Sequence, residues 1–279
     1  MATKRLLGVF AHPDDENLMS GTLLHYQALG VETGLVYATR GEVGEISDPL
    51  ISIPANLAEV RETEMRAAAE VLRVQQFWFL GYRDSGMPGT RDNQHPQSLQ
   101  RARRADVIGK LVAVIRQFQP QVMVTFDEAG GYGHPDHITM YKYATGAFHA
   151  AADELEFPEL GPAHSVSKLY YSADSRRQME IMAEWLQAEN EEGLFNHVDI
   201  SQLGLTNEHI SVVIDVERWR ATMELAASQH RAHKNPNTPL SRLPEELQKN
   251  WHNTEYFQLA TSRVGADIIG ENDLFARVS

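Results

Sequence analysis

The first half of the chain alternates short apolar runs with longer amphipathic ones, and this alternation constrains the fold most strongly. Apolar runs of this length are typical of buried strands, and apolar residues spaced three and four apart are typical of helices. Regular alternation of the two indicates parallel βαβ units in a doubly wound sheet. We expect strands at Leu6–Phe10, Glu32–Thr39, Phe77–Leu80 and Val122–Phe126, and helices at Gly21–Leu29, Pro54–Leu72, Ala105–Phe118 and Ile138–Ala152.

The second half is less regular, and we expect it to form a C-terminal layer on the same domain. The sequence therefore predicts one α/β domain over residues 1–279, divided into a half with the sheet and the candidate chemistry at 1–153 and a layer with substrate loops at 154–279. Strands are expected at Lys168–Ser172, Ile210–Val216 and Tyr256–Thr261, and helices at Glu180–Gln187 and Arg218–His230. Three loops are candidate pocket walls: Arg40–Ile53, Gly81–Gln100 and Asn235–Pro244.

The amino-acid composition limits which classes of partner, metal ligand and location we expect for this chain. The formal net charge is −13, so the surface repels phosphate backbones and anionic lipids, and we expect neither nucleic acid nor membrane as a partner. The chain has no cysteine, so a metal would need His, Asp or Glu ligands. It shows no signal peptide and no stretch long enough to span a bilayer, which predicts a cytoplasmic protein. The sequence leaves a homo-oligomer open.

The run Ala11–Glu16 places one imidazole and three carboxyl groups directly after the first strand. His12 and Asp15 are three residues apart, and Pro13 limits the conformations between them. Imidazole nitrogen and carboxylate oxygen both bind zinc at about 2 Å. Asp14 would project differently and could act as a general base beside a metal-bound water. The alternative is a helix N-terminus, at which the acids only cap the helix and complement its dipole.

A second cluster, His134–His137, follows the strand expected at Val122–Phe126. His137 can supply a third metal ligand, while His134 stands in the loop, free to exchange a proton. Asp136 could orient an imidazole, and Tyr132 could aim its hydroxyl at a developing oxyanion. The alternative is a glycine-rich loop and an ordinary helix cap. Ligands of doubly wound sheets sit at the carboxyl ends of the strands, where both clusters lie.

These two clusters resemble those of the PIG-L/LmbE-like family of zinc de-N-acetylases. That family includes N-acetylglucosaminyl-phosphatidylinositol de-N-acetylase, mycothiol and bacillithiol deacetylases, and mycothiol-conjugate amidase. The resemblance extends through Arg61–Glu64, Leu80–Gly86 and Val122–His137, and it covers about the first 150 residues. Ser228-Gln229 resembles a pattern of the thiol-conjugate branch, but Ala226 stands where that pattern has a histidine.

The resemblance implies a Rossmann-like, mostly parallel sheet flanked by helices, and it implies roles for individual residues. Zinc would be held by His12, Asp15 and His137, and Asp14 would be the general base, with His134 as the imidazole opposite it. Tyr132 would help to stabilise the oxyanion. Arg61 matches an arginine near the substrate, and Asp84, in the same set of motifs, is a second candidate for substrate binding.

The sequence thus predicts an enzyme that removes an N-acyl group, most often acetyl, from an amino sugar or a related small amide. His134 would support the oxyanion when protonated and protonate the leaving amine. The same ligands accept Fe²⁺ or another divalent ion. The alternatives are an amidase of thiol conjugates, a non-haem Fe(II) oxygenase, and a metal- or sugar-binding protein without turnover.

The remaining histidines divide into two groups. His95, His230 and His233 can reach this site only if their loops fold over it. The others lack carboxylate neighbours at ligand spacing, and we expect them on the surface or in the core: His25, His149, His164, His197, His209 and His252.

Overall fold

A mixed sheet runs through the centre of the molecule. The computed structural model describes residues 3–188, 199, 203–233, 243–244, 247–248, 251, 253–265 and 271–279. Its strands are β1 Arg5–Phe10, β2 Glu32–Tyr37, β3 Gln76–Phe79, β4 Val122–Thr125, β5 Lys168–Ala173, β6 Val212–Asp215 and β7 Thr254–Ser262. Within the described residues these seven strands lie in the order β3-β2-β1-β4-β5-β7-β6.

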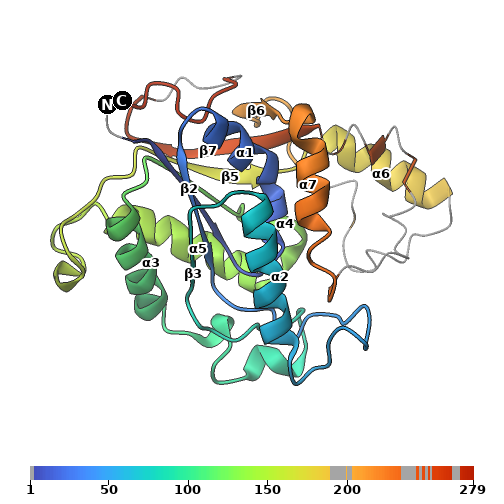
Figure 1. The fold of residues 1–279 in the computed structure, drawn as a ribbon. Helices are drawn as coiled ribbons and strands as arrows, with labels where there is room; N and C mark the ends of the chain where they lie inside the picture. The colour runs from blue at the N-terminus through green and yellow to red at the C-terminus, as the bar shows by residue number, and fades with distance from the viewer. Residues whose placement is uncertain are drawn as a thin grey trace.

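Helices cover both faces of this sheet (Figure 1). The helices α1, α2 and α7 lie together on one side, and α3 and α5 lie together on the other. The α-helices are α1 Ser20–Ala28, α2 Leu57–Val71, α3 Arg104–Phe118, α4 Gly130–Gly133, α5 Pro135–Ala150, α6 Arg176–Ala188 and α7 Arg220–Ala227. Short 3₁₀ turns are η1 Asp15–Leu18, η2 Arg91–Gln94, η3 Leu99–Arg101, η4 Pro158–Leu160 and η7 Glu217–Trp219. None of the helices in the described residues is long and apolar enough to cross a membrane.

The strand order fixes where a ligand can bind. β1 pairs in parallel with β2 on one side and with β4 on the other. The order in which successive strands are added to the sheet therefore reverses between β1 and β4. In open α/β sheets the crevice outside the strand carboxyl ends at such a reversal is the usual binding site. β7 runs antiparallel to both β5 and β6 and extends the parallel part of the sheet. The expected α/β, Rossmann-like and mostly parallel sheet is confirmed.

The central strands are apolar on both faces because helices cover both. The four large side chains of β1, Leu6, Leu7, Val9 and Phe10, have no exposed surface. Continuous apolar runs of this kind are characteristic of parallel strands buried on both sides. The rigid centre of the sheet therefore anchors the turn that follows β1.

The predicted elements agree with the structure to within a few residues, with two instructive differences. The helix predicted from Ile138 begins at Pro135, because proline is well suited to the first helical position. The helix predicted over Arg218–His230 is a 3₁₀ turn followed by α7, which ends at Ala227. The side chains of Ser228 and Gln229 both donate to the carbonyl of Leu225 at this end. The predicted loop Asn235–Pro244 lies outside the described residues except for its last two positions. The single-domain boundaries stay a prediction.

Candidate metal centre and active site

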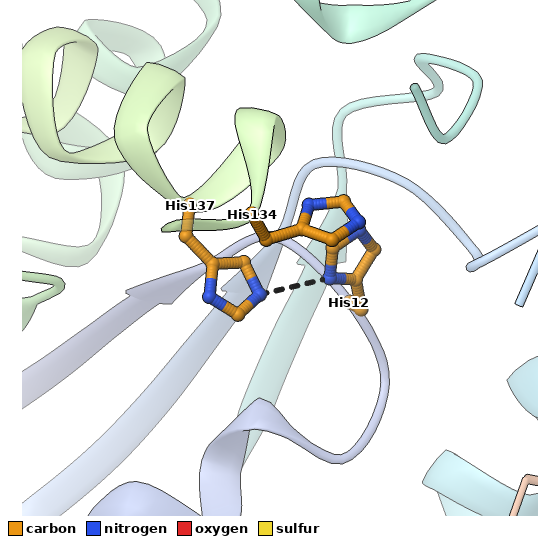
Figure 2. Close-up of side chains that lie close together, drawn as sticks. All are labelled: His12, His134 and His137. Atoms are coloured by element: carbon orange, nitrogen blue, oxygen red, sulfur yellow. Dashed lines mark hydrogen bonds between the residues drawn. The ribbon is translucent and has the colours of Figure 1, made fainter. Parts of the chain in front are cut away.

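Three imidazoles converge between the carboxyl ends of β1 and β4. Figure 2 shows His134 and His137 reaching from the start of α5 toward His12, which follows β1. His12 Nδ1 lies 3.2 Å from His137 Nε2. One nitrogen from each of the three rings lies within 4.8 Å of the others, and all three side chains are buried. The fold thus brings the two distant clusters together, as the sequence predicted.

The carboxylate of Asp15 completes a compact triangle with two of these rings. Its Oδ2 lies 3.5 Å from His12 Nδ1, and its Oδ1 lies 3.3 Å from His137 Nε2. Ligands held about 2.1 Å from a tetrahedral ion stand about 3.4 Å apart. The Asp15 carboxylate is fixed by the backbone N–H groups of Ala11 and His12, which donate to Oδ2 at 3.1 and 2.7 Å. Two imidazoles and one carboxylate at these separations fit one zinc-sized cation.

Two further carboxylates lie on the other side of the His12 ring. Asp136 Oδ2 is 3.3 Å from His12 Nε2, and Asp84 Oδ1 is 3.6 Å from the same nitrogen. His12, Asp84 and Asp136 also lie within 4.8 Å of one another, so they form a second set with metal-ligating atoms. Backbone N–H groups already donate to both facing oxygens, Ser85 to Asp136 and Gly86 to Asp84. We therefore interpret these acids as hydrogen-bond partners that orient the imidazole and leave Nδ1 toward Asp15.

Asp136 and Asp84, both predicted as site residues, lie against the imidazole of His12. The imidazole that Asp136 contacts is that of His12, and the Asp136 side chain has no exposed surface. Asp84 was expected at the substrate. The structure buries it between His12 and the more distant His134, whose Nε2 is 4.0 Å from Asp84 Oδ1. Its role in substrate binding stays a prediction.

The charges of these groups depend on their neighbours. Burial alone would lower the pKa of His12, but the hydrogen-bonded carboxylates of Asp136, Asp15 and Asp84 outweigh it and raise the pKa well above its usual value. Burial lowers the pKa of His134 to about 4, with help from the positive charges of His12 and His137. The backbone N–H of Asp136 donates to His134 Nδ1 at 3.2 Å. A neutral His134 therefore carries its proton on Nε2.

Asp14 stands apart from the triangle. Its backbone has φ 98° and ψ −18°, a left-handed conformation that costs a non-glycine residue about 1–3 kcal/mol. Its carboxylate Oδ2 lies 3.3 Å from the guanidinium of Arg61 and 3.9 Å from His233 Nε2. The Asp14 side chain makes no capping hydrogen bond to the 3₁₀ turn η1 that follows it. The alternative of a simple helix cap is therefore wrong for this residue.

Arg61 reaches the same turn from α2. The guanidinium donates to the carbonyls of Pro13 at 2.6 Å and Gly41 at 3.2 Å, and the residue is only 3% exposed. A Cβ at Gly41 would lie 1.9 Å from Arg61 Nη1, and Gly41 has φ +68°. Glycine is needed here for both reasons. Arg61 thus supports the Asp14 turn from beneath, and its contact with a substrate stays a prediction.

Tyr132 lies at the open side of the site. It projects from the glycine-rich α4, is 42% exposed, and its ring centre is 5.2 Å from that of His137. Burial of the hydroxyl and the negative charge of Asp15 raise the pKa of Tyr132, so the hydroxyl keeps its proton and can donate it. Glycine is needed at position 130 in this turn, because a Cβ there would meet the backbone nitrogen of Ile138 at 2.8 Å.

For His134 the alternative of a helix cap is correct, since its side chain accepts from the N–H of Asp136, yet the same residue also belongs to the imidazole cluster.

Sequence reasoning missed a buried group behind Asp14. His230 Nε2 lies 2.5 Å from Glu16 Oε1, the Tyr37 hydroxyl donates to Glu16 Oε2 at 2.8 Å, and both Glu16 and His230 are buried. Burial would raise the pKa of Glu16, but the charge and hydrogen bond of His230 outweigh it and lower the pKa. The sequence contained two separate signals, the position of Glu16 as the third acid of its run and the condition that His230 reaches the site if its loop folds over it, but nothing that paired the two residues.

The other histidines fall as follows. His230 and His233 do fold against the site, because α7 ends before them. His95 is an acceptor for the backbone N–H of Gln97 and joins neither of the metal-ligating groups found in the described residues. His25, His149, His164 and His209 likewise stay outside those groups. His197 and His252 lie outside the described residues.

Comparison with known proteins assigns the family. Residues 7–148, half of the chain, match the model of the PIG-L family, described as GlcNAc-PI de-N-acetylase. The chain belongs to the PIG-L family. This PIG-L protein is 37% identical to the 1D-myo-inositol 2-acetamido-2-deoxy-alpha-D-glucopyranoside deacetylase of Geodermatophilus obscurus, over 98% of both chains. It is 34% identical to the mycothiol S-conjugate amidase of Streptomyces coelicolor, over 98% of this chain and 97% of the relative.

Among solved structures, N,N'-diacetylchitobiose deacetylase from Pyrococcus horikoshii shares the fold. The TM-score is 0.63 at 20% identity, over 92% of this PIG-L protein and 83% of that chain. The family model and the two relatives confirm the predicted family. The chain is similar over nearly its whole length both to a deacetylase and to a mycothiol S-conjugate amidase, so what Ala226 implies about the substrate stays a prediction.

Proposed function

We propose that this PIG-L protein is a metal-dependent hydrolase that removes the acetyl group from an N-acetylated amino sugar. One observation carries the proposal: His12, Asp15 and His137 meet at separations that suit one ion, while Asp14 is left out of that triangle beside them. The names of the relatives supply the substrate class. A glucosaminyl inositol carrying the acetamido group is the first substrate to test.

The donor set favours zinc. His12 Nδ1, His137 Nε2 and the Asp15 carboxylate would hold the ion, and Fe²⁺ is the alternative because it accepts the same ligand types. When bound, the ion supplies a water whose pKa falls toward about 7 and an electrophile for the amide carbonyl.

The residues around it then divide the work of amide hydrolysis. Asp14, whose carboxylate lies 3.3 Å from the Arg61 guanidinium, accepts a proton as the water oxygen attacks the amide carbon, and returns that proton to the departing nitrogen. The products are acetate and a free amine. The hydroxyl of Tyr132 donates a hydrogen bond to the oxyanion. His134 donates a hydrogen bond to the same oxyanion from Nε2, because Nδ1 already accepts from the backbone. From the sequence we expect a protonated His134 that protonates the leaving amine. We assign that proton transfer to Asp14 instead, because burial lowers the pKa of His134 to about 4.

The test is a substrate panel with the zinc-loaded protein. We expect acetate release from the acetamidoglucosyl inositol, and slower release from N,N'-diacetylchitobiose. Liquid chromatography with mass spectrometry would quantify acetate and free amine. Zinc-loaded protein that releases acetate from none of the acetamido sugars would overturn the proposal.

A second function has specific support in the similarity to the mycothiol S-conjugate amidase. The same groups would act on the amide of a thiol conjugate, because amide hydrolysis there needs the same activated water and the same proton transfers. A mycothiol S-conjugate in the panel distinguishes the two functions, since its cleavage would form a free amine without acetate. Turnover without oxygen would exclude the Fe(II) oxygenase alternative.

A further inference from the structure

Both oxygens of the Glu16 carboxylate are occupied by groups that bear on Asp14. Oε2 accepts from the backbone N–H of Asp14 at 2.9 Å and from the Tyr37 hydroxyl at 2.8 Å. Oε1 lies 2.5 Å from His230 Nε2. Glu16 is 1% exposed and His230 is 4% exposed, so water does not compete for these bonds.

The backbone conformation of Asp14 requires hydrogen bonds of this kind to hold it. Aspartate at φ 98° is strained, and this conformation persists only where the surroundings hold it. Arg61 holds one side of the turn through the carbonyl of Pro13. Glu16 holds the other side through the N–H of Asp14. The direction of the Asp14 carboxylate therefore depends on where the Glu16 carboxylate sits.

The segment that carries His230 is itself fixed by contacts of Ala232 to two other segments. The backbone N–H of Ala232 donates to both oxygens of Glu64 on α2, at 3.0 and 3.1 Å. The carbonyl of Ala232 accepts from the N–H of Ser47 at 2.9 Å. The segment after α7 is thus seated between α2 and the loop after β2, and it presents His230 to Glu16 from outside the family-matched residues 7–148.

We propose that Glu16 and His230 form a positioning pair that aims the carboxylate of Asp14 at the attacking water. The proposal rests on the function proposed above, in which Asp14 is the general base. His230 neither contacts substrate nor binds metal in this role. It orients Glu16, which in turn holds the backbone of Asp14.

The first test is a double-mutant cycle on deacetylation by zinc-loaded protein. We expect His230→Ala to lower kcat about 10- to 100-fold, the scale on which a small misplacement of a catalytic group acts, with KM and zinc content unchanged. His230→Gln, which can still donate to Glu16, should recover part of the loss. Tyr37→Phe is the milder variant if His230→Ala folds poorly, and it should lower kcat less.

The cycle then repeats His230→Ala in an Asp14→Asn background, in which we expect less than about a twofold further loss. Losses that multiply in full would show that His230 acts independently of Asp14 and would overturn the pairing. His164→Ala and Tyr26→Phe are the matched controls. The first removes a partly buried histidine bonded to the Pro120 carbonyl, and the second removes a buried tyrosine hydroxyl bonded to Asp273.

A second test needs no activity, so it still decides the inference if the proposed function fails. Hydrogen exchange measured by NMR reports directly on the Asp14 N–H. We expect that amide to exchange at least tenfold faster in His230→Ala than in the wild type, and at the wild-type rate in His164→Ala. Unchanged exchange in His230→Ala would show that the pair does not hold Asp14.

Discussion

The two halves of the molecule contribute to the site in different ways. In the parallel half, the turns after β1 and β4 bring together His12, Asp15 and His137, because neighbouring parallel strands end at one edge of the sheet. The C-terminal layer adds antiparallel strands at the far edge. In its described part it reaches the site through His230 and His233. From this difference we infer a division of roles: the first half supplies the proposed reacting groups, and the second half holds them in position.

The largest expected effect lies in the parallel half. His137→Ala removes one corner of the triangle, so we expect loss of bound zinc and of deacetylation to below detection. Elemental analysis together with the acetate assay measures both. Chelation of the wild type should mimic the variant, and added zinc should restore only the wild type. A variant with full zinc content would show that His137 is not a ligand.

The next largest effect separates the base from the ligands. Asp14→Asn keeps the shape of the side chain but cannot accept the proton, so kcat should fall about 10²- to 10⁴-fold. Zinc content should be unchanged, because Asp14 lies outside the triangle. Near-wild-type turnover of this variant with zinc bound would remove Asp14 from the mechanism.

A smaller effect is expected beneath the Asp14 turn. Gly41→Ala places a methyl group against Arg61, so we expect about a tenfold loss in kcat/KM and a loss of stability of about 1–3 kcal/mol. Urea unfolding and steady-state kinetics measure the two. Gly30→Ala is the control, because Gly30 has φ +82° but nothing within 4 Å of its added Cβ. Equal behaviour of the two variants would mean that backbone strain alone explains the effect.

The smallest effect on activity is expected in the C-terminal layer. Glu255 on β7 accepts from the N–H groups of Gly21 and Thr22 at the start of α1, yet burial dominates and raises its pKa from 4.5 to about 7. The folded state then binds more protons than the unfolded state between pH 4.5 and 7, so this group makes the protein less stable as the pH rises through that window.

Glu255→Gln should therefore remove a decline in the free energy of unfolding of about 3 kcal/mol across that window. Urea unfolding between pH 4.5 and 8 measures it, with the exposed Glu217→Gln as the control. The deacetylation rate at a permissive temperature should stay unchanged. Parallel stability curves for wild type and variant would contradict the assignment.

Most of the fold was predictable from local pattern. Val122–Phe126 and Leu6–Phe10 are so apolar that burial on both faces is their only favourable arrangement. The order of the strands, with β4 beside β1, came only from the structure. The end of α7 was not predictable, because helical periodicity continues to His230, while the side chains of Ser228 and Gln229 bond the helix end. That short departure from the helix is what turns His230 toward Glu16.

The residue types of the candidate site, and their position after two strands, came from the sequence, because ligand chemistry and strand direction are local properties. Only the tertiary structure decided that Asp136 contacts the imidazole of His12 and that Arg61 lies against Asp14. It also placed His230, nearly one hundred positions beyond the second cluster, against Glu16. Contacts between distant segments depend on how whole layers pack, and no spacing within one segment encodes that packing.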